Sequence, residues 1–362
     1  MRIITKYLIR ELMGPFFFGF LAFSGMFIGW SLVNVIQWAE SYSVPLLTVL
    51  RLWAYNVPEN LAYGVYIGML LATLLGLGRM TSHSETIAMQ AGGVSFMQIA
   101  TPVLIIGAAL TVGTFYLNES LTPMAKHAYR EERTFIRQGK PKGIIDEYFY
   151  TERLKDGKKR LVYAEQYNAT EERFINVMIQ EMEHGQLVRT LKSKELLWGE
   201  GGWYFREGEI FTYREDAVIP VRVTEGYNPS GFEKTPEQVI SLSRRPEEMN
   251  WWELKWYLEN TELSTRKRRQ YEVQLHLKMA FPFACMVFAL LGTPLALQSQ
   301  RRTSSAGLGI TLLNVIFYYV LMAVGTFLGQ SGLTSPWVGA WLQNLLIGGY
   351  GLYLFIRKAF NI

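Results

Sequence analysis

Side chains that could do catalytic chemistry are scattered along this sequence rather than grouped. The four histidines lie far apart, and the single cysteine, Cys285, has no partner for an internal disulfide. Gly139-Lys140 is followed by proline and lacks the earlier glycine of a phosphate-binding loop, and the sequence contains no Gly-x-Ser-x-Gly elbow. We therefore expect no bound metal, no cofactor and no enzymatic activity in this chain.

One polar segment, residues 79–95, has the residue pattern of a short helix. Such a helix could transmit movement from a soluble partner to the membrane spans. The segment lies between two apolar stretches, and Ser82 or Ser84 is expected to cap a short helix over about residues 82–93. Glu85 would stand at the positive N-terminal end of that helix, and a glycine pair would end it. Such a helix could seat in a groove of a soluble partner; an ordinary interfacial loop is the alternative. The residues expected to carry the coupling are Arg79, Ser84, Glu85, Ala88, Ala91 and Gly92.

The elements that must hold this segment are long stretches without charge. Charged residues are absent from residues 12–39, 60–78, 86–118, 279–300 and 303–356. A bilayer-spanning helix needs about 20 apolar residues, so the last stretch is long enough for two spans. The pattern predicts a polytopic α-helical membrane protein with six transmembrane helices, three before and three after a polar insert.

The predicted organisation has three parts. Residues 1–118 hold spans one to three and the short coupling helix, residues 119–270 form the insert, and residues 271–362 hold spans four to six. Basic residues mark the cytoplasmic side of a membrane protein. They occur at both chain ends and in the two short loops that six spans would place on that side: Arg2, Lys6, Arg10, Arg79, Arg301, Arg302, Arg357 and Lys358. Both termini are therefore expected in the cytoplasm and the insert outside. This placement of basic residues also favours lipid headgroups over nucleic acid as partners.

The insert has the pattern of a β-rich domain. The turn signal Asp156-Gly157 separates two alternating runs, and further turn residues follow at roughly ten-residue intervals. Tyr163 and Val177 are expected on the inward face, and helices are expected over 123–138, 247–258 and 264–278. The spacing predicts a sandwich or open barrel with strands over 147–154, 159–167, 174–179, 186–197, 202–213 and 217–226.

The segments flanking the insert share a pattern with one family of membrane proteins. The matching segments are residues 4–11, Val57-Pro58-Glu59 at the expected start of span two, residues 84–95, residues 272–295, Tyr318-Tyr319 and Asn344. In these segments the chain resembles the lipopolysaccharide-export permeases, the paired transmembrane subunits of an ABC-type exporter. The insert matches this family only by its position in the chain and its β-rich class. Which of the two paralogous permease types the chain represents stays open.

The resemblance implies a mechanism with several partners. A cytoplasmic ABC ATPase dimer would bind ATP and Mg²⁺ and act through Glu85. A homologous second permease would enclose a cavity that lipopolysaccharide enters from the outer leaflet of the inner membrane of a diderm bacterium. The lipid would then pass to the periplasmic insert, which in this family is jelly-roll-like. A single-span jelly-roll protein and a periplasmic bridge of the same fold would receive it.

A phosphorylated lipid needs basic residues near the outer interface and an apolar wall for its acyl chains. Interface anchoring is the alternative role for the basic run at 266–269, and ordinary contact with membrane lipids is the alternative for the aromatic residues. At the outer end of span one, where some family members carry basic residues, this chain has Asn34, Gln37 and Glu40. The headgroup candidates are Arg51, Lys126, Arg130, Arg269 and Lys278, and the apolar candidates are Phe20, Phe23, Phe27 and Trp30.

Two other classes of protein remain open on the residues alone. A secondary transporter or channel would carry charges or broken helices at the middle of the membrane, and the sequence shows few. A mechanotransmitting membrane receptor would use the periplasmic insert as a sensor, but its outer domain commonly lies between spans one and two.

Overall fold

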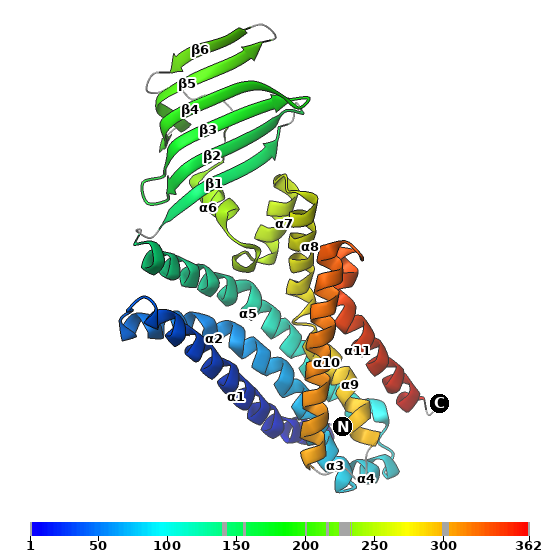
Figure 1. Cartoon of the computed structure of the whole chain (residues 1–362). Helices are drawn as coiled ribbons and strands as arrows, with labels where there is room; N and C mark the ends of the chain where they lie inside the picture. Colours follow the sequence, from blue (N-terminus) through cyan, green and yellow to red (C-terminus); the bar gives the residue numbers. More distant parts are fainter. Residues whose placement is uncertain are drawn as a thin grey trace. The chain divides into compact units, whose positions relative to one another are not determined.

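The computed structural model divides the chain into two compact units (Figure 1). One unit comprises residues 1–129 and 269–362, and the other comprises residues 130–268. The first is helical, and the second carries the β-sheet. The residues that the structure describes are 2–139, 143–154, 157–199, 201–214, 217–223, 232, 234–298 and 304–360.

The helices outside the sheet unit follow the apolar stretches of the sequence. Two of them, α5 and α8, continue across the boundary between the units. The helices are α1 (Arg2–Glu40), α2 (Leu46–Leu71), the π-helix η1 (Ala72–Leu77), α3 (Gly78–Ser82), α4 (Glu85–Ala91), α5 (Phe96–Gln138), α8 (Thr265–Ala280), α9 (Ala284–Gln298), α10 (Ser304–Ser331) and α11 (Pro336–Ala359).

Four helices of the described residues are long and apolar enough to cross a membrane. They cover Ile3–Glu40, Leu46–Ser82, Phe96–Arg137 and Gly309–Ser331. The pair α8 and α9, which is bent by 51° at a short break, raises the number to five if it forms one span. The 24 residues of α11 give about 36 Å of helix. The sixth predicted span depends on this helix, so the count of six stays a prediction.

Span two begins earlier than the family resemblance indicated. The helix starts at Leu46, and Pro58 lies inside it, so Val57-Pro58-Glu59 is not the start of the span. Nor does span two continue as a regular α-helix, because residues 72–77 form the π-helix η1. Segments of this kind are rare and occur mostly as single turns inside α-helices, frequently at functional sites.

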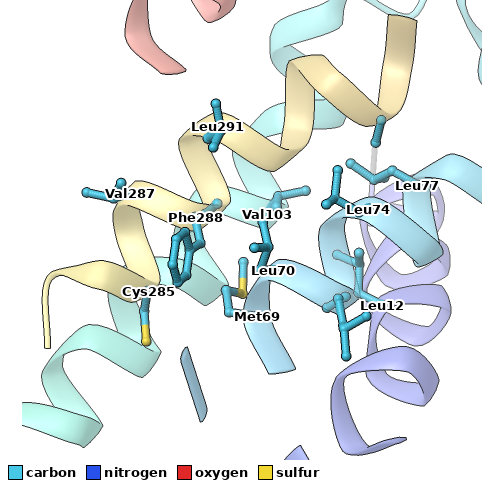
Figure 2. Close-up of a cluster of buried hydrophobic side chains, with 14 of the residues drawn as sticks. Leu12, Met69, Leu70, Leu74, Leu77, Val103, Cys285, Val287, Phe288 and Leu291 are labelled. Atoms are coloured by element: carbon cyan, nitrogen blue, oxygen red, sulfur yellow. The ribbon is translucent and has the colours of Figure 1, made fainter. Parts of the chain in front are cut away.

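Most residues of α9 are buried in the centre of the helical unit. Cys285, Phe288 and Leu291 belong to one apolar cluster with residues of α2, η1 and α5 (Figure 2). Small residues let the neighbouring helices approach closely: a Cβ added to Gly292 would lie 2.0 Å from the Thr73 hydroxyl oxygen of η1. Close packing of this kind holds helices together in lipid, where burial of apolar side chains gives little net driving force.

The break between α8 and α9 leaves a backbone carbonyl that the helix does not satisfy. The Ala284 N–H, which would bond to the Ala280 carbonyl in a continuous helix, donates instead to Phe281. The Asn344 side chain of α11 donates to the Ala280 carbonyl at 2.6 Å, and its own oxygen accepts from the Tyr318 hydroxyl at 2.9 Å. Three helices thus meet at this bend through buried hydrogen bonds.

The described residues of the second unit form six antiparallel strands in one sheet, ordered as they occur in the chain. The six predicted strands are confirmed, and the pairing of Arg153 with Lys159 confirms the first hairpin, although Asp156 of its turn lies outside the described residues. Because the described strands form one sheet, closure into a sandwich, barrel or jelly roll stays a prediction. The strands are β1 (Ile144–Arg153), β2 (Lys159–Asn168), β3 (Arg173–Glu183), β4 (Gln186–Gly199), β5 (Gly202–Arg214) and β6 (Ala217–Val223).

One face of the sheet is buried, and the register shows which residues it contains. Tyr148 pairs with Ala164 and Ala164 pairs with Val177, and all three are buried. Val177 faces inward as expected. The inward prediction for Tyr163 is wrong, because neighbours along a strand point to opposite faces and Tyr163 is 38% exposed.

A buried ion cluster lies at one end of this inward face. Arg160 stands opposite Glu152 on one side and Glu181 on the other, at 3.0 and 2.9 Å. Its side chain is only 4% exposed, and a charge at that depth is costly unless it is paired. The cluster therefore fixes the register of β1, β2 and β3 at that end of the sheet.

In the part of the second unit that the structure describes, three short helices follow the strands: α6 (Pro236–Ser243), η2 (Pro246–Glu248) and α7 (Trp251–Asn260). The helix predicted over 247–258 begins later, because Asn250 caps it. The Asn250 side chain accepts from the Glu253 N–H, and the Glu253 carboxylate accepts from the Asn250 N–H. This reciprocal capping box sets the start of α7.

The hydrogen bonds at the bend give the first testable prediction. Asn344→Leu leaves the Ala280 carbonyl without a donor in an apolar interior, which costs about 2 kcal/mol or more. We expect a lower midpoint of thermal unfolding for the detergent-purified protein. The control is Asn314→Leu, which removes only a hydrogen bond to Ile310 within α10. Equal midpoints for the two variants would contradict a special role for Asn344.

Candidate functional site

The predicted coupling segment contains a short helix that closely follows the sequence expectation. α4 runs from Glu85 to Ala91. Its end is as predicted: the Gly92 N–H donates to Ala88, and Gly93 has a φ of +88°, a backbone conformation that favours glycine. Its start differs, because Ser84 adopts a left-handed conformation and its side chain makes no capping hydrogen bond. Ser82 does not cap α4 either, since its hydroxyl donates back to the Arg79 carbonyl.

The two sides of α4 have different surroundings. Thr86 is buried, and its hydroxyl donates to Thr81 at 3.2 Å, so this side rests on the end of span two. Ala88 and Ala91, predicted to form a small-residue face, are exposed together with Ile87. The helix therefore presents a small, apolar surface on the side away from the rest of the unit.

Glu85 is held by a residue that sequence reasoning did not place at the site. The Tyr7 hydroxyl of α1 donates to the Glu85 carboxylate at 2.7 Å, and the other carboxylate oxygen lies 4.0 Å from a ring nitrogen of His83. Close by on α1, Glu11 pairs with the Arg79 guanidinium. The sequence signals for Tyr7 were its place in the segment 4–11 that resembles the family and its position four residues before Glu11, on one face of a helix.

Two of the predicted headgroup-binding lysines are paired with carboxylates in the helical unit. The Lys126 ammonium lies 2.8 Å from Glu59, whose carboxylate also accepts from the Tyr63 hydroxyl at 3.2 Å. The Lys278 ammonium lies 3.9 Å from Glu119, and both of these side chains are largely buried. Glu59 is thus a partner in an ion pair inside span two rather than a helix-start residue.

The other three predicted headgroup cations lie in separate places. Arg130 begins the second unit, where it pairs with the buried Glu248 at 3.0 Å and donates to the Ser243 carbonyl. Arg269 lies close to Gly332, and a Cβ at that glycine would collide with the guanidinium. Arg51 is exposed on α2. Within the helical unit, Lys126 and Lys278 thus contact different carboxylates, and Arg269 lies beside Gly332.

The aromatic residues predicted to line a cavity divide between two sides of α1. Phe20, Phe23 and Phe27 are half-buried and pack against the core of the helical unit. Trp30 is 69% exposed. The outward side of α1 also carries exposed side chains that the prediction did not select, including Phe17 and Leu21.

Comparisons with known proteins identify the family. The family model described as "Lipopolysaccharide export system permease LptF/LptG" matches residues 6–357. The chain belongs to this family. It is 23% identical over 315 residues to the lipopolysaccharide export system permease protein LptG of Escherichia coli (strain K12), with 84% of each chain covered. It is 21% identical over 367 residues to the LptG permease of Haemophilus influenzae (strain ATCC 51907 / DSM 11121 / KW20 / Rd), with 98% of each covered.

Family membership confirms the resemblance noted in the sequence and decides the protein class. The chain is a permease subunit of the lipopolysaccharide export ABC transporter, a multi-pass protein of the inner membrane. Permeases of this family are non-catalytic transporter subunits. Membership therefore favours the exporter over the secondary transporter and the receptor.

The pairing of Lys126 with Glu59 gives the second prediction. Lys126→Glu places two carboxylates together and should destabilise the permease by about 1 kcal/mol, because the pair is only partly buried. Exchanging the charges, Glu59→Lys with Lys126→Glu, should recover most of that loss. Unfolding of the detergent-purified variants followed by fluorescence measures both effects. An exchange variant no more stable than Lys126→Glu would show that the pair does not form.

Proposed function

We propose that the permease is the passive membrane half of an export machine. A cytoplasmic ABC ATPase dimer binds ATP and Mg²⁺, and its movement is received by α4 and Glu85. The observation that carries this proposal is the exposed apolar surface of α4, formed by Ile87, Ala88 and Ala91. Beside it lies the Glu85 carboxylate, of which Tyr7 occupies only one oxygen. A groove lined with apolar and basic side chains on a soluble partner would complement both.

The proposed topology has six spans with both termini in the cytoplasm. Arg79 lies beside the inner end of α1, where Lys6 and Arg10 are exposed. Phe355, two residues before Arg357 of α11, is in ring contact with Phe96 at the start of α5. These basic residues therefore gather at one end of the helical unit, as the cytoplasmic end of a membrane protein requires. Arg301 and Arg302 lie outside the described residues.

The proposed substrate path follows from the same topology. Residues 119–270 stand in the periplasm as a jelly-roll-like domain, and a second, homologous permease completes a cavity against the exposed side of α1. Lipopolysaccharide enters from the outer leaflet, and its phosphates compete with Glu59 and Glu119 for Lys126 and Lys278. The lipid then passes to a single-span jelly-roll protein and the periplasmic bridge.

The coupling role of Glu85 gives the third prediction. Glu85→Ala should abolish lipopolysaccharide release from proteoliposomes that contain the complete exporter, because the carboxylate facing the ATPase is lost. ATP hydrolysis by the complex should fall with it, while the amount of inserted permease stays unchanged. The matched control is Glu40→Ala, an exposed carboxylate at the other end of α1. Full release by Glu85→Ala would refute the coupling role.

The proposed topology gives the fourth prediction. Cys285 is the one cysteine of the sequence and is buried, so Cys285→Ala provides a background for single-cysteine labelling. In intact spheroplasts, a membrane-impermeant maleimide should label His184→Cys, at the turn between β3 and β4. It should label Gln90→Cys on α4 only after permeabilisation. Labelling in the opposite order would place the insert in the cytoplasm and overturn the topology.

A further inference from the structure

Two contacts join the inner end of α1 to the segment that contains α3 and α4. The Tyr7 hydroxyl donates to Glu85 at 2.7 Å, and the Arg79 guanidinium pairs with Glu11. Tyr7 and Glu11 are four residues apart, so they lie on one face of α1 about one turn from each other. Tyr7 thus ties α1 to α4 and Glu11 ties it to α3, and two such ties one helical turn apart restrain both the sliding and the rotation of α1 relative to the segment of α3 and α4.

Apolar packing between the same elements supports the two ties. Leu8 and Leu12 are fully buried on α1, and both belong to the cluster that contains Leu77 and Met80. A Cβ added to Gly76 of η1 would lie 3.1 Å from a Leu12 methyl carbon, so α1 and η1 are in close contact there. The inner end of α1 and the segment from η1 to α4 therefore form one packed body.

Further along, α1 is a peripheral helix, whereas span two is central. In the most apolar part of each span, 17% of the α1 residues are buried, against 72% for span two. The contact between α1 and α2 is made over small residues: a Cβ at Gly64 would collide with Ser24, and one at Gly68 would press on the backbone of Phe16 and Phe20. Side chains join the two helices as well: the Trp53 indole of α2 donates to the Ile28 carbonyl of α1 at 3.0 Å, and the Phe27 and Tyr63 rings are in contact. α1 is therefore the least buried of the four candidate spans in the described residues, so a displacement of α1 changes the exposed wall of the unit rather than its centre.

We propose that Tyr7 and Glu11 are positioning residues that pass a displacement of α4 directly to α1. The inference rests on the proposed coupling role of Glu85 and adds the route by which movement reaches the lipid-facing helix. When the ATPase shifts α4 together with α3, the two ties carry α1 with them, and the exposed side that bears Phe17, Leu21 and Trp30 moves against the substrate. α2, which is separated from α3 by η1, stays packed on α9.

The Tyr7–Glu85 and Glu11–Arg79 contacts are partly exposed to solvent. Their loss should therefore change the coupling of ATP hydrolysis to export more than the stability of the fold. The Arg79 side chain is 58% exposed, and ion pairs at such positions contribute little to stability. Tyr7 is likewise exposed on one side, and Tyr7→Phe keeps the ring while removing only the hydroxyl. Variants at these positions can therefore test the transmission of movement in an assembled exporter.

The fifth prediction concerns the ratio of lipid exported to ATP hydrolysed. Tyr7→Phe is examined in the complete exporter, reconstituted in proteoliposomes that contain lipopolysaccharide, with ATP hydrolysis and lipid release measured in parallel. We expect hydrolysis to remain within about twofold of the unaltered exporter and lipid released per ATP to fall about tenfold, the effect of losing a hydrogen bond to a charged group. The matched control is Tyr42→Phe, which removes a hydroxyl at the other end of α1 and keeps the ring contact with Trp38.

A charge exchange tests the second tie and remains informative if Tyr7→Phe fails to assemble. Glu11→Arg and Arg79→Glu should each lower the ratio of lipid to ATP, and the two together should restore it. An unchanged ratio in Tyr7→Phe, or no recovery in the exchange variant, would overturn the proposal. If Glu85→Ala abolishes release while these variants leave the ratio of lipid to ATP unchanged, only the route through α1 is wrong. Unimpaired release by Glu85→Ala refutes the proposed function itself.

Discussion

Inside an apolar protein interior no water is available to satisfy a backbone carbonyl, and the helical unit is organised around one such group, the carbonyl of the buried Ala280. The chain bends there between α8 and α9, and α11 supplies the missing donor through Asn344, which is itself held by Tyr318 of α10. The bend is therefore a fixed feature rather than a flexible one. It sets the direction of α9, the buried helix against which α2, η1, α5 and α11 pack.

A rigid centre has consequences for how the permease can work. α9 and span two are mostly buried, whereas only 17% of the most apolar part of α1 is buried. An exporter must move part of its cavity wall without opening its core to lipid. In the described residues the two groups of contacts lie apart: those of Tyr7 and Glu11 are at the N-terminal end of α1, and the buried hydrogen bonds of Asn344 are at the bend between α8 and α9.

The sequence predicted those features that depend on local composition. Uncharged stretches gave the helices, because length and hydropathy suffice to recognise a span. Alternating residues and turn signals gave all six strands, and the glycine pair gave the end of α4. Boundaries set by one capping residue were less accurate: Asn250 starts α7 later than the periodicity indicated, and Ser84 precedes α4 without capping it.

Contacts between distant parts of the chain could not be predicted from one sequence. Tyr7 and Glu85 are 78 residues apart, Lys126 and Glu59 are 67 apart, and Asn344 and Ala280 are 64 apart. Basic residues near the outer interface suggested phosphate binding, but whether a lysine is available depends on the carboxylate that the fold places beside it. For the same reason, the sequence indicated that α1 carries large apolar side chains but not which side of the helix exposes them.

The π-helix in span two bears on how this family can vary in length. Each residue added to or removed from a regular α-helix turns everything beyond it by about 100° and would pull Leu77 and Met80 away from α1. Residues 72–77 instead accommodate one residue more than an α-helical turn requires. A homologue lacking one residue in this window would keep both flanking faces in register, so a single-position gap in an alignment is best tolerated here.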